Sequence, residues 1–282
     1  MVDVERLEIR DSRFDFAFGL HTGFGDERLR LGALKIFLDG SLIGKTAALA
    51  APYASDPTTR GFLVKSEEKI REQVRRAHQG GWQLAMHAIE DRTIEMGQDA
   101  IEPVMGSDTA RFRPRIEHCG VMRRDLIERI RRVSAVIVTQ PRFISELGDG
   151  FRNALGEERL RLTYPLASLQ SLPVAFSSDR PVVNGAPLLG IQAAVHQRTA
   201  SGATYVSEEA IAVEQTLRWY TGGKAYSTFE EHAKGSLCVG KFADFAVLSQ
   251  NPLQVEPDVI GQICILSTVV GGEVVYGRGL SP

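Results

Sequence analysis

The sequence predicts an α/β protein in which parallel strands are covered by helices, followed by a small β module. Short apolar runs alternate with helical patterns from about residue 33 to residue 177, which is typical of parallel sheets. From about residue 235 onward, strand patterns and glycine-containing turns follow one another without helical patterns between them. We therefore expect a first domain over residues 1–234 and a β portion over residues 235–282.

Five apolar runs are predicted to be the parallel strands, and they cover residues 33–38, 83–88, 115–119, 135–139 and 173–177. A helix is expected after Ser66, which can cap it, and the glycines at positions 80 and 81 should end it. Asp125 is expected to cap a later helix. The segment 145–161 is rich in Arg, Gly and Glu and predicts a loop. Residues 7–10 resemble a remnant of one further strand.

The C-terminal part begins with two helical patterns, over residues 188–197 and 207–220. Residues 235–237 and 240–248 are expected to form one β segment. The runs 266–270 and 273–276 flank Gly271 and Gly272, which predicts a tight hairpin because both central residues of such a turn need a positive φ.

The composition excludes several classes of protein. Lys and Arg number 33 and Asp and Glu 35, so the net charge of -2 gives no basic excess for nucleic acid. No apolar run reaches the roughly 18 residues of a membrane-spanning helix, and the first residues do not have the pattern of a signal peptide. Three cysteines without a CxxC motif favour reduced thiols and a cytoplasmic location.

Polar side chains stand at the C-terminal ends of the predicted strands, where α/β enzymes carry their catalytic residues. They are Lys35, Asp39, His87, His118 and Asp179. Taken singly, a strand-end histidine is more often structural, and an aspartate before a proline more often caps a turn. A lysine inside an apolar strand is harder to explain, because burying an unpaired ammonium is costly.

One chemistry accounts for the whole set. Imidazoles and carboxylates are zinc ligands, and a desolvated lysine has a neutral amine that can react with carbon dioxide. The carbamate formed at Lys35 would be an anionic ligand of the same metal site as His87 and His118. Asp179 could then accept a proton as general base.

The sequence resembles the long-chain family 3 of the amidohydrolase superfamily, which includes N-substituted formamide deformylases. The matching stretches are KIFLDGSL (35–42), HAIEDR (87–92), RIEH (115–118), SSDRP (177–181) and, within 234–244, KGSL and GKFAD. The resemblance implies an incomplete (β/α)8 barrel of the TIM type with a small C-terminal β-sandwich portion. It also implies a small-molecule substrate, one or two divalent metal ions, expected to be zinc, and hydrolysis of a C–N bond of amide type other than a peptide bond.

The resemblance also implies roles for individual residues. Lys35 would be carboxylated, His87 and His118 would ligate one metal ion, and Asp179 would ligate the other and act as base. Asp39 and Ser41 are expected to contact substrate.

The chain departs from the family in three substitutions and one absence. Glu90 stands where the family usually has glycine, Arg180 where it has an aromatic residue, and Cys119 where it has alanine. We expect Cys119 to be a buried structural thiol. No two histidines are two positions apart, so the family's His-x-His pair is missing; the histidines are His21, His78, His87, His118, His196 and His232. We therefore expect the C-terminal part of such an enzyme, with little activity by itself.

A non-catalytic truncated homologue that keeps the fold and at most one structural metal is the main alternative. A sugar or nucleotide binder is less favoured, because no glycine-rich phosphate loop of the required spacing is present.

An incomplete barrel leaves open sheet edges, and unpaired strand edges favour pairing with another chain. We predict that the polypeptide forms a homo-oligomer or associates with a separate N-terminal piece. Size-exclusion chromatography with light scattering should give a mass above that of one chain, and a uniform monomer would contradict the prediction.

Overall fold

The computed structural model describes residues 1–3, 19–106 and 109–277. The chain folds into two compact units. Unit 1 comprises residues 1–139, 150–165 and 169–173, and unit 2 comprises residues 140–149, 166–168 and 174–282. This division differs from the boundary predicted after residue 234, and a separate barrel and β portion remain a prediction.

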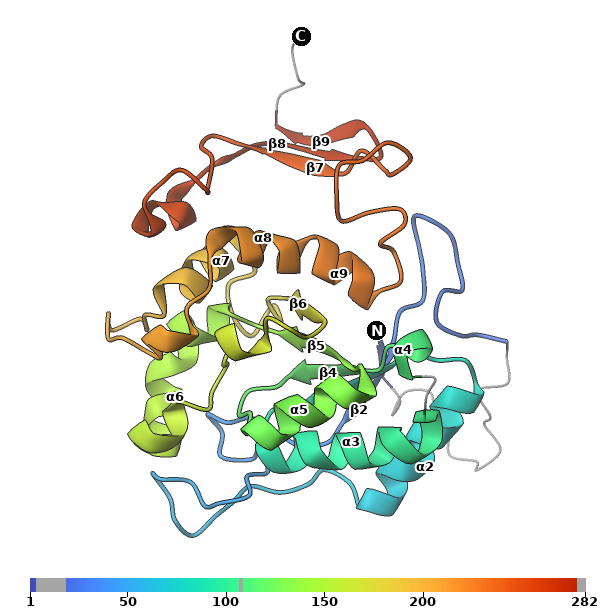
Figure 1. The fold of residues 1–282 in the computed structure, drawn as a ribbon, viewed down its shortest axis with the longest axis vertical. Helices are drawn as coiled ribbons and strands as arrows, with labels where there is room; N and C mark the ends of the chain where they lie inside the picture. Colours follow the sequence, from blue (N-terminus) through green and yellow to red (C-terminus); the bar gives the residue numbers. More distant parts are fainter. Residues whose placement is uncertain (4–18, 107–108, 278–282) are drawn as a thin grey trace. The chain divides into compact units, whose positions relative to one another are not determined.

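Unit 1 contains five parallel strands that are neighbours in chain order (Figure 1). They are β1 (Val2–Asp3), β2 (Leu34–Phe37), β3 (Leu84–Ala88), β4 (Arg115–His118) and β5 (Val136–Thr139). The sequence patterns predicted β2 to β5, and they missed β1. The proposed strand over residues 7–10 lies outside the described residues.

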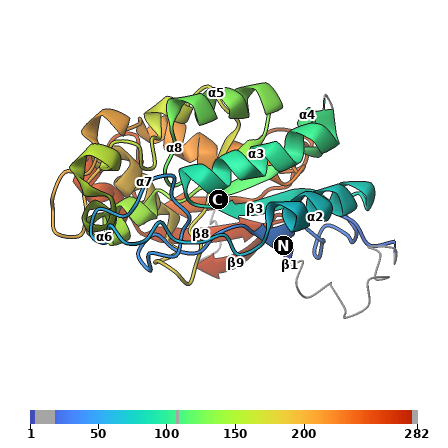
Figure 2. The same ribbon diagram turned by 90° about the horizontal axis from the view of Figure 1, so that it is seen from below.

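Three helices of unit 1 lie side by side, with α3 (Asp91–Met105) between α2 (Glu67–Gln79) and α5 (Arg124–Val133) (Figure 2). The short α4 (Thr109–Phe112) follows α3. Ser66 caps α2 as predicted, because its hydroxyl accepts a hydrogen bond from the Lys69 N–H. A Cβ built on Gly97 of α3 would lie 3.2 Å from Met86 Cε, so glycine allows the close approach of α3 to β3.

The strands of unit 1 use their two faces differently. Leu34, Ile36 and Met86 are fully buried on one face. Because side chains alternate along a strand, the opposite face of β2 and β3 carries Lys35 and His87, which are only partly buried. The apolar face is therefore the one available for packing against helices, and the other face carries the polar residues.

Unit 2 contains β6 (Val174–Phe176) and the helices α7 (Pro187–His196), α8 (Val213–Tyr220) and α9 (Gly222–Ser227). Both α8 and α9 pack against β6 (Figure 1). Short 3₁₀ helices are η3 (Ser207–Glu209) and η4 (Pro257–Gln262), and η2 (Ala167–Leu169) includes residues of both units. The rings of Phe176 and Trp219 meet in a T-shaped contact, with centroids 5.0 Å apart.

An antiparallel sheet of β7 (Phe245–Leu248), β8 (Ile265–Val270) and β9 (Glu273–Gly277) completes unit 2. The predicted hairpin is confirmed, since Gly271 and Gly272 have φ values of 59° and 85° between β8 and β9. The predicted β segment over 235–248 was too long, because only residues 245–248 form a strand.

Three other predictions about helices were wrong. The expected loop over 145–161 is largely α6 (Arg142–Leu160), in which buried Phe151 and Leu155 outweigh the glycines, and the helix kinks at Gly156. Asp125 lies in the first turn of α5, and Arg123 occupies the cap position. The helix expected over 207–220 is interrupted between η3 and α8.

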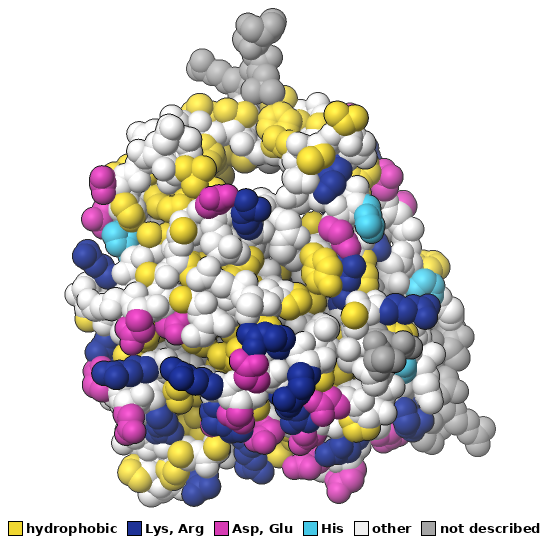
Figure 3. All heavy atoms as spheres, in the orientation of Figure 1, with side chains coloured by type: hydrophobic (Ala, Val, Ile, Leu, Met, Phe, Trp, Pro, Cys, Tyr) yellow, Lys and Arg dark blue, Asp and Glu magenta, His cyan; other side chains and the backbone are white. Residues whose placement is uncertain are grey.

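The surface agrees with the absence of a basic excess in the sequence. On the face drawn in Figure 3, Lys and Arg side chains lie interspersed with Asp and Glu. Arg129 of α5, for example, contacts both Asp99 and Glu102 of α3, at 2.6 and 2.7 Å. Among the helices of the described residues, none combines the length and apolar composition needed to cross a membrane.

The buried ion pair on β4 provides a test of the fold. Arg115 Nη2 lies 2.6 Å from Glu117 Oε1, and both side chains are about 95% buried. We predict that Glu117→Ala lowers the free energy of unfolding by about 3 kcal/mol, because it leaves a buried guanidinium without its counter-charge. Glu214→Ala, which breaks an exposed pair on α8, should cost less than about 0.5 kcal/mol. Equal losses in urea unfolding of the two variants would contradict this.

Candidate active site

Lys35 and Phe37 project from the same face of β2, because they are two residues apart on a strand. In the parallel register Lys35 lies opposite Ala85 and Phe37 opposite His87. Lys35 Nζ lies 5.2 Å from the centroid of the Phe37 ring, and that ring lies 5.1 Å from the His87 ring. The face predicted to carry the lysine therefore also carries the first histidine.

The two strand-end histidines meet. His118 Nε2 lies 3.0 Å from His87 Nδ1, and the two ring planes make an angle of 70°. In the register His118 is paired with Ala88, so simple alternation along β4 does not account for the contact with His87. His118 has a φ of 78°, in the left-handed region that ends the strand, and its side chain is 2% exposed. The contact therefore depends on the turn that closes β4.

A backbone carbonyl determines which nitrogen of His87 carries the proton. His87 Nε2 lies 2.9 Å from the carbonyl oxygen of Gly40, which can only accept. Nε2 is therefore the protonated nitrogen, and Nδ1 turns its lone pair toward His118. Burial and, to a smaller extent, the positive charge of Lys35 lower the pKa of His87 to about 4, against the opposing effect of the Gly40 hydrogen bond. The ring is neutral at pH 7, as a metal ligand must be.

Asp39 joins the end of β2 to the start of α3. Its carboxylate is 2% exposed and accepts hydrogen bonds from Ile89 N–H, Glu90 N–H and the Thr93 hydroxyl, the last at 2.7 Å. Its Oδ1 also lies 3.4 Å from His87 Nε2. Burial raises the pKa of Asp39 to about 6, although these hydrogen bonds act in the opposite direction. The carboxylate is thus buried and engaged by hydrogen bonds within the chain, and the substrate contact expected from the sequence stays a prediction.

The other two predicted residues lie on exposed turns. Ser41 is exposed, and its hydroxyl accepts a hydrogen bond from Gly44 N–H in the turn after β2. Asp179 belongs to unit 2, follows β6 and is exposed, with a left-handed φ of 55°. The structure thus brings His87 and His118 into contact within unit 1, with Lys35 near enough to act electrostatically on His87, and it describes Asp179 in the other unit.

Cys119 is fully buried, as expected from the sequence. Its thiol donates a hydrogen bond to the Ile116 carbonyl, and burial followed by the negative charge of Glu117 raises its pKa well above the usual value. It is a structural thiol.

Glu90 is the residue that the sequence analysis did not place in the site. It is fully buried at the start of α3, and neither carboxylate oxygen has a hydrogen-bond partner among the described residues. Burial, and then the charges of Asp39 and Asp91, raise its pKa well above the usual value, while Arg159 lowers it. The available signal was its position three residues after His87, where the family usually has glycine.

The two imidazoles fit a metal ion as neighbouring ligands. His87 Nδ1 and His118 Nε2 lie 3.0 Å apart, and both are imidazole nitrogens of the kind that ligates zinc, so these two residues would hold the ion. In the described part of the chain, no group of three or more His, Cys, Asp or Glu side chains is placed to hold an ion.

Comparison with known proteins defines the class. The sequence profile of the amidohydrolase family matches residues 3–276, so this chain belongs to the amidohydrolase family, as its resemblance to family 3 indicated. An uncharacterized metal-dependent hydrolase from Pyrococcus furiosus has 36% sequence identity and a TM-score of 0.74, over 84% of this chain and 48% of that one. The fold is an α/β fold that corresponds to part of a TIM-type barrel.

Two relatives show what kinds of protein share the sequence. YtcJ of Bacillus subtilis (strain 168), whose name describes it provisionally as an amidohydrolase, is 34% identical over 89% of this chain and 48% of its own length. The N-substituted formamide deformylase of Arthrobacter pascens is 28% identical over 89% of this chain and 46% of its own. The chain spans about half the length of these relatives.

The raised pKa of Glu90 predicts the direction in which the stability of the fold changes with pH. Its pKa is raised in the folded chain, so the buried carboxyl destabilises the fold increasingly as the pH rises above its usual pKa of 4.5, and below that pH this cost disappears. Glu90→Gln should therefore raise the free energy of unfolding more at pH 7 than at pH 4, by about 1.4 kcal/mol for each tenfold difference in proton affinity.

The measurement is urea unfolding at both pH values. Glu273→Gln, an exposed change on β9, is the control and should leave the pH dependence of the wild type unchanged. A Glu90→Gln chain with the wild-type pH dependence would contradict the prediction.

Proposed function

We propose that this chain supplies the His87–His118 part of a divalent-metal site in a hydrolase that cleaves C–N bonds of amide type other than peptide bonds. The observation that carries the proposal is the 3.0 Å approach of His87 Nδ1 to His118 Nε2, with the His87 proton held on Nε2 by the Gly40 carbonyl. In that arrangement His87 Nδ1 accepts a hydrogen bond from His118 Nε2, and a bound metal ion would take the place of the shared proton. The opposite nitrogen of the His87 ring is anchored as in known metal sites.

Lys35 is proposed as the anionic third ligand after carboxylation of its amine. It is partly buried, shares one face of β2 and β3 with His87 and acts electrostatically on that ring. As an ammonium, Lys35 would repel a cation, whereas a carbamate would attract one. Carboxylation would therefore replace a positive charge that repels the metal ion with a negative charge that attracts it.

A divalent ion, with zinc as the proposed metal, would act as a Lewis acid toward the amide carbonyl and toward water. His87 and His118 would hold it, and Gly40 would fix the His87 tautomer. Asp179 is proposed to accept a proton on its carboxylate and deliver it to the leaving amine, a role that suits an exposed carboxylate on a turn after β6. Ser41, which is exposed after β2, is retained as a proposed substrate contact.

The substrate class rests on the relatives. The Arthrobacter pascens protein is by name a deformylase of N-substituted formamides, and the Pyrococcus furiosus structure is by name a metal-dependent hydrolase. We propose by analogy a small molecule with an amide-type C–N bond. Within the cytoplasm, which the free cysteines favour, the chain would act together with a second copy or with a segment that provides further ligands.

A non-catalytic homologue is the second candidate, and one observation favours it. In the described ranges, His, Cys, Asp and Glu side chains form no group of three or more that could hold an ion. Such a protein would keep the fold with one weakly held metal or none.

Metal analysis separates the two candidates. After incubation with zinc and gel filtration, the wild-type chain should retain close to one zinc per chain. We predict that His87→Ala and Lys35→Ala each lower the zinc content by at least about tenfold, because each removes a ligand. Lys45→Ala, a lysine in an exposed pair with Asp56, should retain the wild-type content.

Two further results decide the proposal. With bicarbonate enriched in carbon-13, the wild-type chain should show a carbamate resonance that the Lys35→Ala chain lacks. Folded wild-type protein, judged by circular dichroism, that retains no zinc would favour the non-catalytic homologue.

A further inference from the structure

Three asparagines occur in the sequence, and all three are exposed in the structure. They are Asn153, Asn184 and Asn251. An asparagine loses its side-chain amide when the main-chain nitrogen of the following residue attacks Cγ, so the identity of that residue controls the reaction. Glycine leaves the attacking nitrogen the most accessible, because it has no Cβ. Asn184 is the one asparagine that a glycine follows, Gly185.

The other two asparagines lack an accessible nucleophile. Asn153 lies inside α6 and is followed by Ala154, which carries a Cβ and is 3% exposed. Asn251 is followed by Pro252, whose nitrogen has no hydrogen and cannot attack. Asn251 otherwise matches Asn184 closely, because in both turns the side-chain Oδ1 accepts a hydrogen bond of 3.0 Å from the main-chain N–H two residues later. The following residue is therefore what distinguishes these two exposed turns.

The Asn184–Gly185 turn lies between β6 and α7, outside any helix or strand. Ala186 N–H donates to Asn184 Oδ1, and a donor at this oxygen stabilises the negative charge that develops there when Cγ is attacked. Within the described part of the chain, Gly185 N–H donates no hydrogen bond, so the nucleophile has none to break. The side-chain nitrogen of Asn184, which is the leaving group, has no partner among the described residues either.

We propose that the Asn184–Gly185 peptide is a site of non-enzymatic deamidation. The Gly185 nitrogen gives up its proton to the solvent and bonds to Asn184 Cγ, the bond from Cγ to the side-chain nitrogen breaks, and ammonia leaves a succinimide ring behind. Water then opens the ring at either carbonyl carbon, so position 184 becomes an aspartate or an isoaspartate. The reaction consumes water and releases ammonia, without oxidation or reduction, and it does not depend on the hydrolase function.

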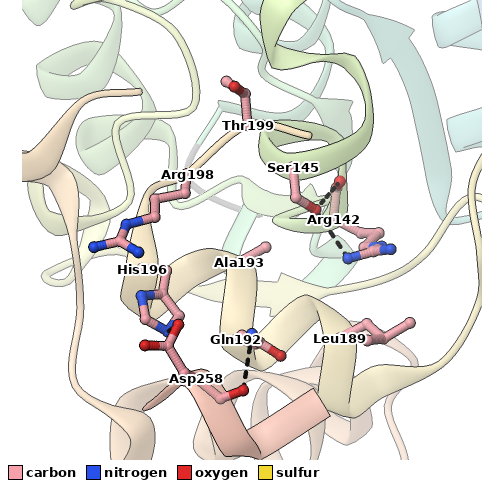
Figure 4. Close-up of a pocket in the computed structure, with 9 residues that line it drawn as sticks. All are labelled: Arg142, Ser145, Leu189, Gln192, Ala193, His196, Arg198, Thr199 and Asp258. Carbon is pink, nitrogen blue, oxygen red and sulfur yellow. Dashed lines mark hydrogen bonds and ion pairs between the residues drawn. The ribbon is translucent and has the colours of Figure 1, made fainter. Parts of the chain in front are cut away.

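The new carboxylate would join a chain of charged contacts within unit 2. Both carboxylate oxygens of Glu146 lie 3.3 Å from the main-chain nitrogen of Asn184, and Glu146 Oε1 accepts a hydrogen bond of 2.6 Å from Arg142 Nε. Arg142 lines a half-open cavity of about 230 Å³ formed by α6, α7 and η4, where its Nη1 donates to Ser145 (Figure 4). Deamidation would therefore add a negative charge close to the acidic partner of Arg142, and isoaspartate would also lengthen the main chain just before α7.

Peptide mapping by mass spectrometry tests the proposal on the intact chain. The wild-type protein is incubated in mildly alkaline buffer, sampled over several weeks and digested under mildly acidic conditions, and circular dichroism confirms that the samples are folded. We expect the peptide with Asn184 to gain the mass that accompanies conversion of an amide to an acid, and to separate into aspartate and isoaspartate forms. Asn153 and Asn251 should keep their amides over the same period.

Two glycine variants separate the role of Gly185 from the exposure of the turn. The φ of Gly185 is not in the left-handed region, and a Cβ there would lie 3.0 Å from Cδ of the flexible Arg180 side chain, so Gly185→Ala can be accommodated. Conversion of Asn184 should become at least about tenfold slower, because the Cβ hinders the attacking nitrogen. Gly222→Ala, in the same unit, is the control and should leave the rate unchanged, since its Cβ would meet nothing closer than 3.8 Å.

Three results would overturn the proposal: no mass gain at Asn184 in the folded wild-type chain, equal conversion of Asn251, or an unchanged rate in the folded Gly185→Ala chain. If circular dichroism shows that Gly185→Ala is not folded, the comparison of Asn184 with Asn251 in the wild-type chain decides the result.

Discussion

The buried carboxylate of Asp39 accepts hydrogen bonds from the main chain of Ile89 and Glu90 and from the hydroxyl of Thr93. These contacts tie the C-terminal end of β2 to the turn between β3 and α3. The same segment after β2 provides the Gly40 carbonyl that holds the His87 ring. The orientation of the candidate metal ligand therefore depends on a hydrogen-bond network made largely of main-chain groups, which is more rigid than one made of long side chains.

Burying carboxyl groups at this network destabilises the fold, and Glu90 is an example. A second carboxyl lies buried close enough to Asp39 for the two charges to interact, and the Glu90 oxygens have no hydrogen-bond partner in the described structure. A protein selected for stability alone would place an apolar or smaller residue there. Buried polar groups that weaken the fold are found most often near functional sites, and the position of Glu90 follows that rule.

Much of the site was predictable because parallel strands present their C-terminal ends at one edge and side chains alternate along each strand. The first rule placed Lys35 and His87 at the same edge, and the register of β2 and β3 then puts both side chains on one face. They did not predict how His118 reaches His87, since that contact follows from a left-handed φ at the end of β4. The burial of Asp39 was missed for a similar reason: its hydrogen-bond donors lie about 50 residues further along the chain.

The sequence by itself determined the alternation of strands and helices, the β8–β9 hairpin and the family of the protein, because these depend on local periodicity, on glycine at positive φ and on short motifs. Only the tertiary structure decided that α6 is a helix, which nitrogen of His87 is protonated and that residues from α6, α7 and η4 enclose a cavity. These features depend on contacts between residues far apart in the chain. The free energy of such contacts cannot be deduced from local sequence patterns.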